Sequence, residues 1–268
     1  MDFQHAKRTT VMMFLLSSLS FFASTKGIID TSLYQDLYEA GTLPKNLIWG
    51  SRAQDMVSAP LALMLAASSF LFLKNHSMKC YIGMLGLAWY FFYAFGLYAI
   101  QAQYTSIYLI YLAVFGLSFY SLVFGLLGIT PEEARKYQIP PRLRKGILLF
   151  LTFMLAFLYP VWIMRLLTDV GSHVPGPTYG VFVLDLALVL PAIGIITYML
   201  WKRKPFGVLL SGVALIKIFT LCLSWGFGEW TNPLAGNFFV VEMALLSSVL
   251  TVLGLLFLIP YMRTLKKV

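Results

Sequence analysis

Eight long apolar stretches constrain this chain more than any other feature of its sequence. They cover residues 9–23, 54–73, 80–100, 106–129, 146–167, 179–201, 206–226 and 238–262. An α-helix needs about 20 apolar residues to cross the roughly 30 Å of hydrocarbon in a bilayer. None of the stretches alternates apolar and polar residues as the strands of a membrane β-barrel do. The sequence therefore predicts an all-α fold, a polytopic transmembrane helix bundle with eight spans.

The composition excludes the main alternatives to a membrane protein. Of the 268 residues, 59% are hydrophobic and 12% are charged, whereas about a quarter are charged in a soluble domain. The apolar content also excludes a disordered chain, and two cysteines are too few for a disulfide scaffold.

The basic residues predict the orientation of the bundle. If the N-terminus lies inside and the chain crosses eight times, 15 of the 20 Lys and Arg residues fall on the inner side. We therefore expect a multi-pass protein of the cytoplasmic membrane with both termini in the cytoplasm. The net charge of +9 then follows from topology and predicts no nucleic-acid partner. The expected partners are membrane lipids and another membrane protein or a second copy of the chain.

The first stretch has two interpretations. Its basic start and short apolar core are also typical of a secretory signal peptide. Phe21 and Phe22 are poor neighbours for a cleavage site, which favours a retained span. Cleavage stays open as the alternative.

Faint internal similarity predicts that the chain is built from two parallel four-helix repeats. Asp55 precedes Pro60 in the second stretch, and Asp185 precedes Pro191 in the sixth. The predicted parts are a first half at residues 1–129, a cytoplasmic linker at 130–145 and a second half at 146–268. With four spans in each half, the repeats would be related by an axis along the membrane normal.

Polar residues inside or beside the spans are the candidate site. Charges at membrane depth are costly and usually face a bundle interior, a cavity or a partner. The sequence predicts an outward-facing polar pocket for substrate binding. Its candidate lining residues are Arg52, Gln54, Asp55, Tyr93, Tyr111, Asp185, Lys217 and Glu242. Arg52 stands one helical turn before Asp55, so we expect it to donate hydrogen bonds to that carboxylate.

The loop at residues 27–51, on the predicted outer side, carries the pattern of a short amphipathic helix. Leu33, Leu37 and Tyr38 are its spaced apolar residues, and Gly41 to Pro44 would end it. We expect this helix to lie on the membrane surface or to cap the bundle.

No motif indicates a metal, a cofactor or a nucleotide. The three histidines form no pair four residues apart, and Cys80 and Cys222 stand alone. The chain has no phosphate-binding loop, dinucleotide fingerprint or nucleophile elbow. We therefore expect neither a metal site nor a cofactor.

One short motif resembles that of a known family. The run from Ser51 to Asp55, with Pro60 behind it, is similar to the Arg-Gly-Gln-Asp motif that opens a span in a family of bacterial and archaeal integral membrane proteins. The tyrosines between Tyr90 and Tyr111 and the pair Leu184–Asp185 resemble later features of that family. Ala53 replaces its expected glycine, and Phe182 stands where a histidine often occurs. The family has no assigned reaction, so the resemblance implies a multi-pass architecture alone.

Three function classes fit these features. The leading hypothesis is a transporter or permease for a small solute or ion, supported by intramembrane charges of both signs and by two prolines that kink spans. A non-catalytic membrane subunit or assembly factor is the alternative. The third is a membrane-embedded enzyme that uses the outer carboxylates as acid and base.

Overall fold

The computed structural model describes residues 3–268 and is built from eight long helical segments. Residues 1 and 2, which belong to the predicted first half, lie outside the described residues. The segments are α1 (Phe3–Ile29), α3 (Lys45–Asn75), α4 (Met78–Ile100), α5 (Tyr108–Leu127), α7 (Pro141–Ser172), the composite α8–η1–α9 (Tyr179–Leu184, Asp185–Val189 and Leu190–Trp201), α10 (Gly207–Thr231) and α11 (Val241–Thr264). All eight are long and apolar enough to cross a membrane. The predicted all-α, multi-pass architecture is confirmed.

The short elements lie at the two ends of the bundle. They are α2 (Ser32–Glu39), α6 (Pro131–Arg135), η2 (Asn232–Ala235) and the two-residue strands β1 (Tyr137–Gln138) and β2 (Lys266–Lys267). α2 is the expected amphipathic helix. Its buried residues are Leu33, Tyr34 and Leu37, whereas Tyr38 is exposed. The helix therefore turns Tyr34, not Tyr38, toward the bundle.

Several helices extend beyond the apolar stretches that predicted them. α7 begins at Pro141, five residues before its stretch, and α1 continues past residue 23 to Ile29. The added turns contain polar and basic residues. They are helical but are not part of an apolar stretch. The apolar parts of these helices are the ones that the sequence identifies.

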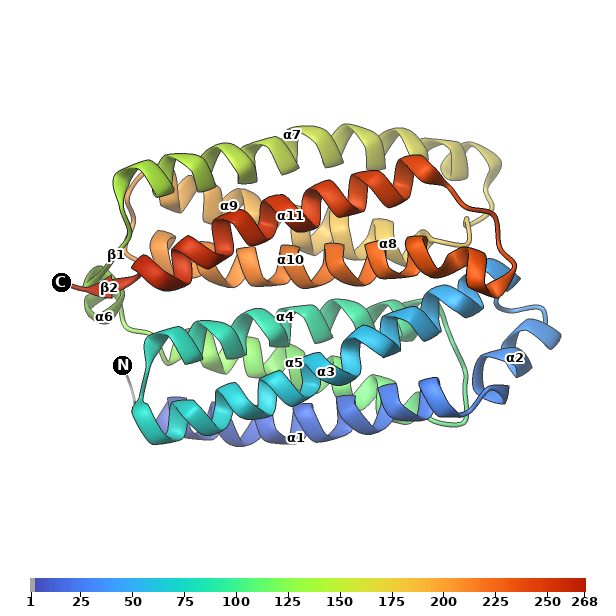
Figure 1. The fold of residues 1–268 in the computed structure, drawn as a ribbon, viewed down its shortest axis with the longest axis horizontal. Coiled ribbons are helices and arrows are strands. Elements are labelled where there is room, and N and C mark those ends of the chain that lie inside the picture. The colour runs from blue at the N-terminus through green and yellow to red at the C-terminus, as the bar shows by residue number, and fades with distance from the viewer. Residues whose placement is uncertain (1–2) are drawn as a thin grey trace.

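The eight helices form two groups of four with the same order of neighbours (Figure 1). In the first group, α1 and α4 each contact both α3 and α5; in the second, α7 and α10 each contact both α9 and α11. The groups meet where α10 packs on α3 and α4, and where α4 packs on α8. The predicted duplication stays a prediction, for which superposition of the two halves is the direct test.

α4 and α10 form the centre of the molecule. They are the most buried of the eight segments, while α5, α7 and α11 expose large apolar faces. At the contact of α4 with α10, a Cβ added to Gly86 would lie 2.5 Å from Ile216 Cβ. Glycine therefore permits the close approach of the two central helices, as small residues do at interfaces inside membranes.

The start of α1 and the C-terminal tail lie at the same end of the bundle, and α2 lies at the opposite end (Figure 1). The loops 74–79, 130–145 and 202–205 and the tail 263–268 carry much of the positive charge, so we name their end the basic end and the other the α2 end. At the basic end, β1 pairs with β2 in an antiparallel ladder that joins the linker to the C-terminal tail. That the basic end faces the cytoplasm stays a prediction.

Candidate functional site

The structure separates the candidate residues into two buried groups and some outliers. The first group, the Asp55 cluster, consists of Asp55, Tyr34, Tyr98 and Tyr111. The second, the Asp185 cluster, consists of Asp185, Trp162, Lys217 and Tyr93. α4 contributes to both, through Tyr98 and Tyr93.

Two tyrosine hydroxyls donate to the carboxylate of the Asp55 cluster. Asp55, on α3, is 1% exposed. Its Oδ2 accepts a hydrogen bond from Tyr34 Oη at 2.5 Å and its Oδ1 accepts one from Tyr98 Oη at 3.1 Å. Tyr111 Oη lies 3.3 Å from Tyr34 Oη and extends the network to α5. Both carboxylate oxygens thus have donors, as a buried polar group requires.

Tyr34 reaches Asp55 from outside the spans, because α2 folds over the end of the bundle. Its buried face places the Tyr34 ring 6.2 Å from the Tyr98 ring. Burial, followed by the charge of Asp55, raises the pKa of the Tyr34 hydroxyl well above its ordinary value. The phenol therefore stays protonated and remains a donor at any physiological pH.

Arg52 and Gln54 hydrogen-bond to backbone carbonyls and not to the Asp55 carboxylate. Arg52 Nη2 donates to the carbonyl of Ile28 at 3.1 Å, and Gln54 Nε2 donates to the carbonyl of Ala94 at 3.0 Å. The expected hydrogen bonds from Arg52 to Asp55 are therefore replaced by those from the two tyrosines. Arg52 instead joins α3 to the end of α1, and Gln54 joins α3 to α4.

The Asp185 cluster brings together four helices from both groups. Trp162 on α7 donates its indole N–H to Asp185 Oδ2 at 2.8 Å. The charge of Lys217 on α10 interacts with the same carboxylate. The Nζ of Lys217 lies 4.6 Å from the centroid of the Tyr93 ring on α4. A cation over an aromatic face is attracted by the ring quadrupole. The cluster thus joins a buried acid, a buried base and two aromatic rings.

Lys217 is a buried charged group whose ammonium has few partners. The residue is 2% exposed. Within residues 3–268, its ammonium group has no hydrogen bond and no ion pair as short as 4.0 Å. A buried cation without a bonded partner is costly, and ring contacts to Tyr93 and, at 6.0 Å, to Trp89 offset part of that cost.

Asp185 occupies an irregular position in its helix. It begins a π-helical turn, Asp185–Val189, that is followed by Pro191 in α9. π-turns inside α-helices frequently occur at functional sites. The wider turn and the missing N–H of proline leave backbone carbonyls of this region less fully paired than in a regular helix.

Glu242 lies apart from both groups. It is an exposed residue in the first turn of α11. The sequence groups Glu242 with the other residues because of its depth along the span. Depth does not determine which face of the helix carries a residue. Conversely, sequence reasoning did not assign Tyr34, Tyr98 or Trp162 to the site. The spacing of Leu33, Tyr34 and Leu37 on one face of α2 was the signal for Tyr34.

Neither cluster has the composition of a metal centre. In the described part of the chain, no three His, Cys, Asp or Glu side chains gather as metal ligands would. The chemistry available is that of a carboxylate, an ammonium group, phenols and an indole. Such groups bind ions and exchange protons.

Comparison with known proteins gives no relative: no family model matches the chain, and no curated protein or solved structure is significantly similar to it. The resemblance of the Asp55 motif to a membrane-protein family stays a prediction. The function is therefore argued from the geometry of the clusters.

Proposed function

We propose that this integral membrane protein is a carrier that couples the movement of protons to that of a small anion at the Asp185 cluster. The observation that carries the proposal is the environment of Lys217, a buried cation whose nearby acidic group, among the described residues, is the Asp185 carboxylate. Ionisable residues within spans mark ion pathways and proton relays in many membrane proteins.

The coupling follows from the charges of the pair. While Asp185 is ionised, it balances Lys217 and the cluster is neutral. When Asp185 takes up a proton, the positive charge of Lys217 is left uncompensated, and a small anion can restore neutrality. Binding of a proton and of an anion therefore favour each other, as cotransport requires.

The backbone around Asp185 supports the same role. Carrier sites are commonly formed by interrupted helices at the interface between structural repeats. Asp185 lies on a π-turn before Pro191, and the cluster takes side chains from α4 of the first group and α7 and α10 of the second. Movement of one group relative to the other would change access to this position.

The Asp55 cluster has a supporting role in this proposal. Its carboxylate is already bonded to two tyrosines, and one of them comes from α2. The cluster thus fastens α2 across the end of the first group. If the halves arose by duplication, Asp55 is expected to occupy the position equivalent to that of Asp185.

The test uses proteoliposomes that contain a pH-sensitive dye. Wild-type protein is offered a panel of small carboxylates, inorganic anions, cations and amino acids. We expect at least one anion class to produce proton movement above that of empty vesicles, and Asp185→Asn to lose it. Asp36→Asn, which removes an exposed carboxylate on α2, is the matched control and keeps it.

Two results would contradict the proposal. Wild-type protein that moves no protons with any solute favours the alternative of a non-catalytic subunit. Equal proton movement by wild-type protein and Asp185→Asn would remove the assigned role of the carboxylate.

A further inference from the structure

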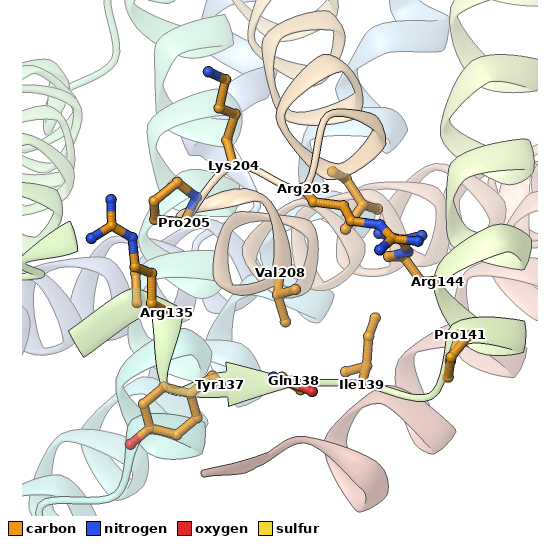
Figure 2. Close-up of a pocket in the computed structure, with 12 residues that line it drawn as sticks. Arg135, Tyr137, Gln138, Ile139, Pro141, Arg144, Arg203, Lys204, Pro205 and Val208 are labelled. Atoms are coloured by element: carbon orange, nitrogen blue, oxygen red, sulfur yellow. The ribbon is translucent and has the colours of Figure 1, made fainter. Parts of the chain in front are cut away.

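A basic pocket opens at the basic end of the second group of helices (Figure 2). Its volume is about 320 Å³. The linker supplies Ala134, Arg135 and residues 137–139, α7 supplies Pro141 and Arg144, and the segment from α9 to α10 supplies the rest. The pocket shares no residue with the Asp185 cluster.

Four cations and no carboxylate line this pocket. They are Arg135, Arg144, Arg203 and Lys204. Across residues 3–268, none of the four side chains has a hydrogen bond, an ion pair or a ring contact. In Figure 2 the side chains of Arg144 and Arg203 converge at one end of the pocket, whereas Lys204 turns away. Two guanidinium groups directed toward one place repel each other unless an anion lies between them.

The backbone at Arg203 gives a second, independent observation. Arg203 has φ +54°, in the left-handed region that favours glycine. It is the second residue after the end of α9, where Arg203 N donates to Leu200 O at 3.4 Å and Lys204 N donates to Met199 O at 2.8 Å. This is the Schellman motif, whose left-handed position is usually glycine. An arginine there costs backbone strain that a glycine would not.

The surroundings of the pocket identify the source of the anion. Arg144 lies in the first turn of α7, just before its apolar stretch begins, which is the level of lipid headgroups. Beyond the pocket, Leu149 of α7 and Tyr198 and Trp201 of α9 expose 73%, 51% and 62% of their surfaces. Acyl chains have an apolar surface there, next to the basic pocket.

We propose that this pocket binds the phosphate group of an anionic phospholipid, with Arg144 and Arg203 as its principal ligands. Guanidinium groups pair with phosphate oxygens in a planar, bidentate manner. Basic pockets between spans on the cytoplasmic side bind anionic headgroups in other membrane proteins. The first turns of α7 and α10, which begin at Pro141 and Gly207, add the partial positive charge of two helix ends.

Native mass spectrometry of the purified full-length chain tests this proposal. Phosphatidylglycerol or phosphatidylcholine with the same acyl chains is added at equal concentration, and bound lipid is measured. We expect wild-type protein to retain phosphatidylglycerol preferentially. Arg144→Gln and Arg203→Gly should each weaken its binding by about fivefold or more, the usual effect of one cation near an anionic surface.

Two controls separate specific binding from general attraction. Arg142→Gln removes an exposed charge of α7 that does not line the pocket, and we expect it to bind like wild type. Arg203→Gly relieves the left-handed strain, so we expect a higher melting temperature without lipid together with weaker lipid binding. A merely unfolded variant cannot give that combination.

Three outcomes would overturn the proposal. Equal retention of the two lipids would show that charge is not recognised. An equal loss in Arg142→Gln and Arg144→Gln would show that the pocket is not the site. Displacement of phosphatidylglycerol by inorganic phosphate at equal concentration would assign the pocket to a soluble phosphate instead of a lipid.

Discussion

At the residue scale, the burial of one carboxylate depends on a missing side chain. Gly27, near the end of α1, lies so close to α3 that an added Cβ would be 1.8 Å from Asp55 Oδ2 and 3.0 Å from Tyr34 Oη. Asp55 cannot move without breaking the hydrogen bonds from Tyr34 and Tyr98. Gly27 thus permits the Asp55 cluster to form against α1.

We predict that Gly27→Ala destabilises the protein by about 1–3 kcal/mol, the usual cost of forcing an extra group into a packed interior. The measurement is the unfolding transition in detergent. Gly50→Ala is the matched control, because Gly50 is a helical residue at the same end with nothing within 4 Å of its added Cβ. Alanine there should be neutral or stabilising by up to about 1 kcal/mol. A similar loss in both variants would contradict this account.

The sequence predicts the burial of three charges but neither the exposure of Glu242 nor how the buried charges are grouped. Asp55, Asp185 and Lys217 are 1%, 6% and 2% exposed, as the cost of placing a charge against lipid requires. Their partners depend on the rotation of each helix about its axis and on the path of the loop that carries α2. The hydropathy of a span determines neither the rotation of the helix nor the path of the loop. The sequence therefore does not assign Tyr34 or Trp162 to the site, and it groups Glu242 with residues that it does not contact.

At the element scale, the linker fastens the C-terminal tail. Lys267 Nζ lies 3.2 Å from Glu133 Oε1, and Lys136 Nζ lies 3.0 Å from its Oε2. Partial burial acts to raise the pKa of Glu133, but the hydrogen bonds from the two lysines outweigh it and hold that pKa below its ordinary value. The contribution of this ion pair is therefore present above the ordinary carboxyl pKa and lost as the pH falls through the lowered one.

We predict that Glu133→Gln loosens the tail at neutral pH, because it removes the charge that both lysines contact. Trimming of the C-terminus by a carboxypeptidase should become faster, with no large change in the melting temperature. Glu132→Gln, an exposed neighbour, should be trimmed at the wild-type rate. Unchanged trimming of Glu133→Gln would show that the β1–β2 ladder alone holds the tail.

Helix boundaries and local motifs were predictable to different degrees. Eight spans and the amphipathic character of α2 follow from apolar spacing, which is set by the need to bury one face or cross the bilayer. The π-turn at Asp185 and the left-handed Arg203 were not predicted. Both depend on tertiary contacts around a proline or a helix end, and residue preferences alone would place an ordinary helix and a glycine there.

At the scale of the whole molecule, two four-helix groups with the same order of neighbours meet through α4, α8 and α10. The Asp185 cluster lies at the contact between the two groups. Tyr93 comes from the first group, and Asp185, Lys217 and Trp162 come from the second. A charge pair at such an interface can serve stability, transport or both. Removal of one charge alone does not distinguish these roles, because it leaves the other uncompensated.

The most direct measurement therefore removes both charges together. Asp185→Asn alone should lower stability by up to about 3–5 kcal/mol, and the double variant Asp185→Asn/Lys217→Met should recover most of that loss. Proton movement is then measured in vesicles for the folded double variant, with the anion class to which wild-type protein responds. The account predicts a stable protein that moves no protons above empty vesicles. A double variant that is stable and moves protons as fast as wild type would show that the pair only holds the helices together.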